Sequence, residues 1–206
     1  MKSGLFSFLA RSNADPLFNS REWLTAWWDQ YATVVGGELD IRVLDDEGDL
    51  KALALMHRRQ VRHRVGLSGI RLELLGTARG VSGVGFSERT DFILEAGSEP
   101  GLVERLAAEL AADESWSDLV VSYAPERGVT HQVMQSLARR CGADLRIVDG
   151  MEAWELPLDG DFDEFLRSLG SGTRARLMNG RKRLEQAGHL RERVLGPEEL
   201  EHGWDI

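Results

Sequence analysis

The spacing of aromatic residues near the amino terminus predicts a helix over residues 19–31. Trp23, Trp27 and Tyr31 recur at intervals of four, which places the three rings on one helical face, and capping residues precede them. We expect Trp23 and Trp27 to pack in the core. The alternative is an aromatic platform, formed together with Trp28, that holds a sugar or a base.

The pattern then changes to alternation. Residues 39–44 alternate between apolar and polar side chains, which is typical of a half-buried strand, and the acidic segment 45–48 ends in glycine, as turns often do. We therefore expect an antiparallel hairpin. Its second strand would run from about residue 50 to residue 56 and on into the basic stretch 57–64.

Later patterns complete a first unit of the chain. Apolar residues at helical spacing predict two further helices, and short apolar runs predict further strands. In chain order we expect a strand at 71–75, a Gly-rich surface loop at 76–85 and a strand at 91–94. A helix at 99–112, a central strand at 116–123 and a helix at 129–140 that ends at Gly142 would follow. A strand pair at 145–148 and 151–156 would close this unit. Residues 1–158 are therefore predicted to have an α/β (α+β) fold, with a mixed, largely antiparallel sheet flanked by helices.

The remaining residues, 159–206, have a different pattern. Helices are expected at 161–169 and 171–187, the second with Leu177 and Leu184 facing inward, followed by a strand at 190–195 and a capped helical start at 197–200. These elements are too few for a core of their own. We expect them either to pack on the first unit or to open a second domain that is incomplete in this chain.

Composition and charge narrow the class of protein. The chain has 206 residues, 42% of them hydrophobic and 29% charged, with a formal net charge of −9. We expect a cytoplasmic protein without a membrane span, because no apolar run is long enough to cross a bilayer. The single cysteine, Cys141, excludes an internal disulfide, and it has no histidines beside it at metal-ligand spacing, so no metal is expected. We interpret Cys141 as an inert thiol.

The charge is unevenly distributed. Residues 171–193 carry a local charge of +5, so the rest of the chain carries −14, and residues 57–64 carry +4 without an acid. An acidic body argues against a nucleic-acid partner. His57 and His63 could act as general bases, but within a run of arginines we interpret them as part of a solvated basic strand.

The helix at 171–187 is the strongest candidate for binding chemistry. We expect Arg174 to contact an anionic group of a substrate, with Arg176 and Lys182 as weaker candidates and Trp23 as a further substrate-binding residue. Backbone donors at the helix start would assist with a phosphate-bearing ligand. The alternative is a solvated helix face without a ligand. Common phosphate-loop, nucleophile-elbow and zinc motifs are absent from the sequence.

Several strings, taken together, resemble one family. These are DPLFNSREWLTAWW at 15–28, LLG at 74–76 with DF at 91–92, WELP at 154–157 with FDEFLRSL at 162–169, and RARL at 174–177 with RKRLEQAG at 181–188. They resemble bacterial acetyltransferases associated with cellulose biosynthesis, a branch of the GNAT superfamily. That branch is similar to the Fem-type transferases, which carry two GNAT-like domains in tandem.

The resemblance implies a fold and an activity. Residues 1–158 would be a GNAT-like amino-terminal domain, and residues 159–206 the helical opening of a second, truncated one. The family uses acetyl-CoA or another acyl-CoA. Its donor loop, [QR]-x-x-G-x-[GA], has no good match here, because Arg79 precedes Gly83 and Gly85 by one residue too many.

Two functions of different classes follow from these expectations. The first is an acyltransferase-like protein that acts on a cell-envelope or polysaccharide-related acceptor, in which this chain supplies acceptor recognition and lacks the acyl-CoA site. The second is a non-catalytic binding or scaffold module with the same fold. The acceptor would be a small molecule, a glycan or a peptide, and no general base is assigned. Exposed apolar residues of an incomplete second domain would also favour a homo-oligomer.

Overall fold

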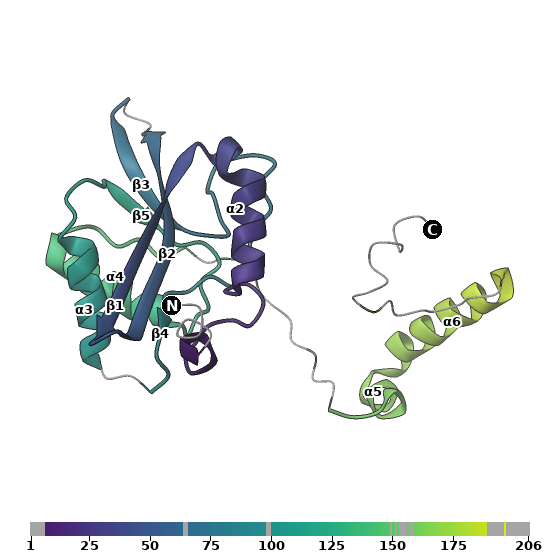
Figure 1. The fold of residues 1–206 in the computed structure, drawn as a ribbon. Helices are drawn as coiled ribbons and strands as arrows, with labels where there is room; N and C mark the ends of the chain where they lie inside the picture. The colour runs from purple at the N-terminus through teal and green to yellow at the C-terminus, as the bar shows by residue number, and fades with distance from the viewer. Residues whose placement is uncertain are drawn as a thin grey trace. The chain divides into compact units, whose positions relative to one another are not determined.

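The computed structural model describes residues 7–63, 66–97, 100–148 and 159–188, together with the single residues 150, 152, 156 and 196. The chain divides into two compact units, Met1–Met151 and Glu152–Ile206, whereas the sequence patterns indicated a boundary after residue 158. Figure 1 shows both units, and each is described by itself.

Helix α2, Arg21–Val35, begins and ends at the signals that the sequence carries. The Ser20 hydroxyl accepts a hydrogen bond from the Trp23 backbone N–H at 3.2 Å, which satisfies a donor that the first turn leaves free. Gly36 ends the helix in the left-handed region, with φ of 64°. The predicted helix over this segment is therefore confirmed.

Among the described residues, the sheet contains five strands. They are β1 (Gly37–Asp46), β2 (Asp49–Arg62), β3 (Ser68–Leu74), β4 (Ile93–Leu94) and β5 (Asp118–Val120). The order along the sheet is β1-β2-β3-β5, and β4 pairs separately with β2. All pairs are antiparallel except β3 and β5, which run parallel.

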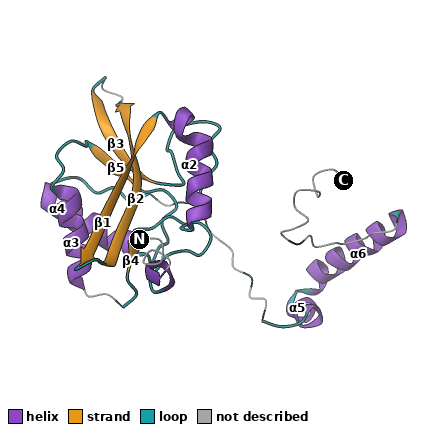
Figure 2. Ribbon diagram, viewed as in Figure 1, coloured by secondary structure: helices purple, strands orange, loops and turns teal. Residues whose placement is uncertain are grey.

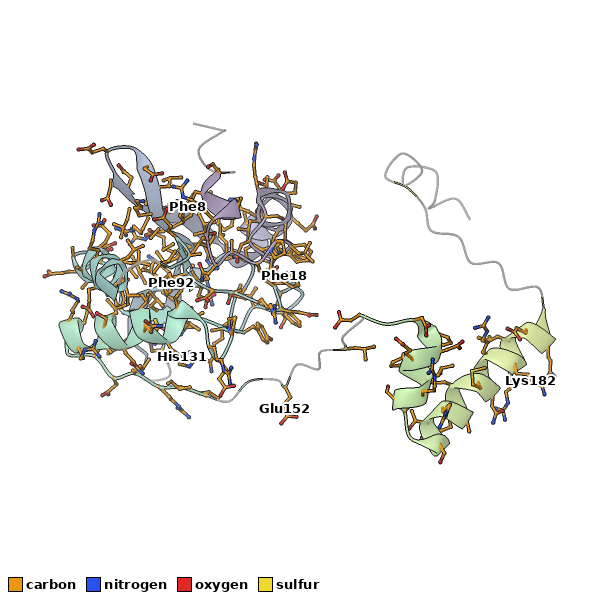
Figure 3. The ribbon with its side chains drawn as sticks, turned by 90° about the horizontal axis from the view of Figure 1, so that it is seen from below. Phe8, Phe18, Phe92, His131, Glu152 and Lys182 are labelled. Carbon is orange, nitrogen blue, oxygen red and sulfur yellow. The ribbon has the colours of Figure 1, made fainter. Side chains whose placement is uncertain are left out.

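Helices cover both faces of this sheet (Figure 2). Helices α3 (Pro100–Ala111) and α4 (Val129–Cys141) pack on one face with a core that includes Met56, Leu72 and Leu106. Helix α2 lies on the other face, where Trp27 packs near Leu55 and Leu75. Phe92 is fully buried in the first core (Figure 3). The expected mixed fold, with a largely antiparallel sheet flanked by helices, is confirmed at this level.

Two strand predictions in the first unit are wrong. Residues 143–148 have no regular structure, and Ile147 and Val148 are exposed, because no described strand lies beside them; the predicted partner, 151–156, is described only at residues 152 and 156. The apolar run at 119–121 was expected in a central strand. β5 instead lies at the end of the sheet order, because β3 is its one partner among the described strands, while Leu119 and Val121 pack against the core that α3 and α4 share.

The second unit contributes two helices among its described residues. Helix α5 (Phe162–Ser168) begins at Asp161, whose carboxylate accepts from the Glu164 backbone N–H at 2.7 Å. Helix α6 (Ser171–Ala187) has the predicted bounds but no buried residue. The inward orientation expected for its leucines is wrong: Leu177 and Leu184 are exposed, because nothing described covers them.

The elements expected at 190–195 and 197–200 lie outside the described residues. Among the helices that the structure describes, none has the length and apolar character needed to cross a membrane.

Candidate functional site

The parallel pair of strands defines one edge of the sheet where ligands commonly bind. Because β3 and β5 point the same way, the segments that follow them, 75–77 and 121–123, emerge at the same edge. In open, mostly parallel α/β sheets the loops at the carboxyl ends of the strands form the usual binding region, and we apply this rule here to the one parallel pair. We call this region the carboxyl edge.

Two aromatic rings are stacked and exposed at the carboxyl edge. Phe86 and Tyr123 have centroids 4.7 Å apart and an interplanar angle of 20°. Phe86 is 45% exposed and Tyr123 38% exposed, although large aromatic side chains usually contribute most when buried. Tyr123 also has a φ of 59°, which is uncommon for a residue other than glycine. Exposed, stacked rings on a strained loop are a candidate ligand platform.

Backbone hydrogen bonds bring the two rings together. The Ser87 N–H donates to the Gly76 carbonyl at 2.7 Å, which holds Phe86 beside the end of β3. The Thr90 N–H donates to the Tyr123 carbonyl at 3.3 Å. Sequence reasoning missed the pair because Phe86 and Tyr123 lie in separate loops with no periodic pattern around either ring.

Helix α2 fixes the loop that carries Phe86. The Trp27 indole N–H donates to the Gly85 carbonyl at 2.7 Å, and the Trp23 indole N–H donates to the Ser87 hydroxyl at 2.9 Å. Gly76 has a φ of 92°, and a Cβ at that position would collide with the Ser87 side chain. The predicted Gly-rich surface loop is therefore at the surface around residues 79–83, while its ends are tied to the protein.

Beneath this loop lies a buried histidine. His57 is fully buried, so its interpretation as part of a solvated basic strand is wrong; its side chain lies on the face covered by α2, with the rings of Trp27 and Trp28 centred 5.9 and 6.0 Å away. Its Nε2 donates to the Thr77 carbonyl at 2.8 Å. Its Nδ1 has no hydrogen-bond partner among the described residues. Burial lowers the pKa of His57, which favours the neutral form of the ring.

Glu73 is the acidic neighbour of His57 in the sheet. It is 1% exposed, and its Oε2 lies 3.6 Å from the His57 Nε2. One carboxylate oxygen accepts from the Arg59 guanidinium at 3.1 Å and the other from the Arg79 backbone N–H at 3.0 Å. Burial raises the pKa of Glu73, while Arg59 acts in the opposite direction.

Charged side chains continue this group across the same face of the sheet. The Arg71 Nε donates to Asp118 at 2.7 Å, and Arg71 also lies 3.7 Å from Glu73. We call His57, Glu73, Arg59, Arg71 and Asp118 the inner polar cluster. Because His57 and Glu73 are closed off from solvent, neither can take a proton from a bound substrate in this conformation. The cluster instead holds the segment after β3 in place, through the Thr77 carbonyl and the Arg79 N–H.

The structure places the sequence-predicted site residues in different units. Trp23 belongs to the first unit and is half-buried. Its indole N–H donates to Ser87 and its ring packs against Phe18, with centroids 5.2 Å apart, so it supports the loop. Arg174, Arg176 and Lys182 lie on α6 in the second unit (Figure 3 labels Lys182).

The helical geometry of α6 divides its three predicted binding residues. At 100° per residue, Arg174 and Lys182 are about 80° apart around the helix, whereas Arg176 is about 160° away from Arg174. The helix therefore presents Arg174 and Lys182 together and Arg176 separately. Arg176 and Lys182 are exposed and Arg174 is half-buried.

The remaining candidates among the described residues are the possible metal ligands and the single thiol. No group of three or more acidic, histidine or cysteine side chains there is arranged to hold a metal ion. Cys141 is a free, exposed thiol at the last position of α4.

Comparisons with protein-family models, with curated proteins and with solved structures gave no match to this chain.

Proposed function

We propose that this chain is an acyltransferase-like protein whose first unit binds a glycan acceptor of the cell envelope, and that it does not itself bind the acyl donor. The observation that carries the proposal is the exposed Phe86–Tyr123 stack at the carboxyl edge. Sugar rings present flat C–H faces that pack on aromatic rings, and a pair of rings fixed by backbone hydrogen bonds needs little ordering on binding.

The order of elements supports the acyltransferase part of the proposal. The helix α2, four antiparallel strands (β1 to β4), the helix α3, the parallel strand β5 and the helix α4 follow one another, as the resemblance to GNAT transferases leads us to expect. A fold is shared by many functions, so this support is by analogy. Support for a binding site comes from the Phe86–Tyr123 stack and not from the fold.

The chain between β3 and α3 supports the absence of a donor site. In this segment the backbone of the Gly-rich loop is held by α2, and the chain then forms β4 beside β2 before α3 begins. Its glycines do not match the donor-loop pattern. In an intact transferase, backbone N–H groups would polarise the thioester carbonyl and a general base would deprotonate the acceptor. We assign that base to no residue of this chain.

In the second unit, taken by itself, the helix α6 carries the proposed contact to an anionic group. Arg174 and Lys182 form the basic side of α6 in this proposal, with Arg176 on another side. Replacing Arg174 by Glu should weaken the binding of inorganic pyrophosphate, used as a phosphate-bearing probe, whereas Arg167→Glu on α5 should not. Equal affinities for the wild type and Arg174→Glu would reject the role of Arg174.

Glycan binding is tested by calorimetry with cellotetraose, an uncharged β-glucan. The wild-type chain should bind it, and Phe86→Ala should reduce the affinity by about tenfold, the effect of one lost stacking partner. Phe162→Ala provides a matched control, since Phe162 is also exposed but lies in the second unit. Equal binding by the wild type and Phe86→Ala would refute the site.

Donor binding is tested separately with acetyl-CoA. The proposal expects no saturable heat, and tight binding would overturn the statement that this chain lacks the donor site. The alternative function, a non-catalytic binding module, rests on the same stack. The reading frame downstream of Ile206 separates the two: a further domain-sized segment with the donor-loop sequence favours a transferase, and a stop codon favours a binding module.

A further inference from the structure

In the described part of the chain, strand β1 ends the sheet, and its long outer edge has no partner strand. Its ten residues pair with β2 on one side, and no described strand pairs with its other side. Natural proteins usually shorten such edges or protect them with proline, lysine, inward-pointing charges or β-bulges, because free N–H and C=O groups recruit other strands. β1 contains neither proline nor lysine. Its inward-facing charges, Asp40 and Arg42, pair with each other, and its register shift lies near its end, between Leu44 and Asp45.

The side chains of β1 are distributed in an unusual way between the two faces. Leu39, Ile41 and Val43 are 46%, 50% and 46% exposed, whereas Asp40 is buried and Arg42 half-buried. The charged residues occupy the face covered by α3, where Arg42 pairs with Asp40 and with Asp113. On the opposite face α2 packs near Leu55 and Leu75, and leaves the apolar residues of β1 uncovered. An exposed apolar row on a free strand edge is typical of an interaction surface.

The sequence of β1 is complementary to itself. If two copies pair antiparallel about a two-fold axis at Ile41, each Leu39 lies opposite Val43 of the second copy, and the two Ile41 side chains meet on the axis. On the other face, Asp40 of each copy lies opposite Arg42 of the other copy. Opposite residues in an antiparallel pair share a face, so over residues 39–43 apolar side chains meet apolar ones and acids meet bases.

Neighbouring registers lack this complementarity. An axis at Asp40 places two aspartates opposite each other, and an axis at Arg42 does the same with two arginines. An axis at Val43 sets Asp40 against Asp46. Like charges directly opposite destabilise a strand pair, so the charges on β1 favour the register centred on Ile41.

We propose that β1 is a dimerisation strand, and that a second copy of this chain extends the sheet across a two-fold axis at Ile41. The order would be β5-β3-β2-β1 followed by β1-β2-β3-β5 of the second copy. The interface is isologous, as expected for a symmetric dimer, and it covers the apolar row formed by Leu39, Ile41 and Val43. The proposal is independent of the acyltransferase function.

The oligomeric state of the full chain tests the proposal. Sedimentation velocity over a concentration series should show a dimer for the wild type, and Ile41→Arg should raise the dissociation constant at least about tenfold, because two like charges would meet on the axis. Ile41 is half exposed, so this change leaves the core intact, which circular dichroism checks. Leu67→Lys is the control, since Leu67 is 68% exposed and precedes β3, away from the β1 edge.

Cross-linking tests the register. In a Cys141→Ser background, which removes the exposed native thiol, Ile41→Cys should form a covalent dimer with a short bis-maleimide reagent. Leu39→Cys should not, because four residues along the strand separate the two Leu39 positions by about 13 Å. It should cross-link only when mixed with Val43→Cys.

Each of the following results would overturn the proposal: a monomeric wild type, a dimer that Ile41→Arg leaves unchanged, or equal cross-linking of Leu39→Cys and Ile41→Cys. Hydrogen exchange identifies the reason for a monomer. Slow exchange of β1 amides would indicate that another part of the chain covers the edge, and fast exchange that nothing does.

Discussion

Removing the carboxylate of Glu73 should destabilise the first unit strongly. Glu73→Ala deletes the acceptor of the Arg59 guanidinium and of the Arg79 backbone N–H, which lie 3.1 and 3.0 Å from its oxygens. Arg59 then keeps only the Arg79 carbonyl, at 2.7 Å. The variant leaves a nearly buried positive charge and a backbone donor with fewer partners.

The size of the effect follows from burial. Removing one member of a buried ion pair typically costs about 3–5 kcal/mol, because the other charge stays away from water without its partner. Glu73→Gln keeps the shape and one acceptor oxygen, so it should cost less, about 1–3 kcal/mol for the group left unsatisfied. We therefore expect the unfolding free energies to fall in the order wild type, Glu73→Gln, Glu73→Ala.

Urea unfolding followed by tryptophan fluorescence measures these differences, because the rings of Trp27 and Trp28 on α2 lie against His57, the neighbour of Glu73. The control is Asp46→Asn, which removes a surface pair with Arg105 at 2.9 Å and should leave the midpoint unchanged. If Glu73→Ala shifts the midpoint no more than Asp46→Asn does, then the inner polar cluster does not stabilise the first unit as we argue.

Three further changes probe other parts of the first unit. Burial lowers the pKa of His57 in the folded protein, so the stability that the neutral ring contributes is complete above the pKa of an unfolded histidine, about 6.5, and is lost as the pH falls below that pKa. Glu73 has a raised pKa, so its contribution to stability changes with pH in the opposite direction. His57→Gln should therefore lose less stability than the wild type between about pH 7.5 and about pH 5.5, measured by urea unfolding, and an equal loss would contradict this. Asp91 accepts from the Val129 and Thr130 N–H groups at the start of α4, where Gly128 offers no side-chain cap, so Asp91→Ala should cost about 1–2 kcal/mol in thermal unfolding. Leu106→Ala, in the fully buried core, should cost about 2–5 kcal/mol, and a cost under 1 kcal/mol would show that the core there is loosely packed.

Local signals explain which elements could be predicted. Ser20 and Gly36 fix the ends of α2, and Gly142 fixes the end of α4 with a φ of 59°, because capping depends on the identity of a few neighbouring residues. The end of α6 was predictable because Gly188 follows it, although Gly188 is extended there and Gly170 offers no side-chain cap at the start. The burial of α6 was not predictable, since exposure depends on what lies beside a helix and not on its own sequence.

Long-range contacts explain the failures. The alternation in β1 predicted a strand correctly. The rule that antiparallel strands bury apolar side chains and expose polar ones would bury Leu39 and Ile41 and expose Asp40 and Arg42. The opposite arrangement occurs because Asp113, more than seventy residues later, supplies an ion-pair partner on the covered face. His57 is likewise buried through Thr77 and the tryptophans of α2, which its basic neighbours in the sequence gave no reason to expect.

The candidate site also depends on long-range contacts, which the sequence does not reveal. Phe86 and Tyr123 meet only because the Ser87–Gly76 and Thr90–Tyr123 backbone hydrogen bonds join two loops. Trp23, which the sequence did single out, proved to be part of the support for Phe86, through Ser87.

Aromatic proton NMR of the full chain, titrated with cellotetraose, tests whether the exposed rings bind a glycan. We expect saturable shifts of the Phe86 and Tyr123 ring signals with a common affinity, while the signals of Phe162 in the second unit stay fixed. Unchanged Phe86 and Tyr123 signals, or equal movement of Phe162, would contradict a glycan site at the carboxyl edge.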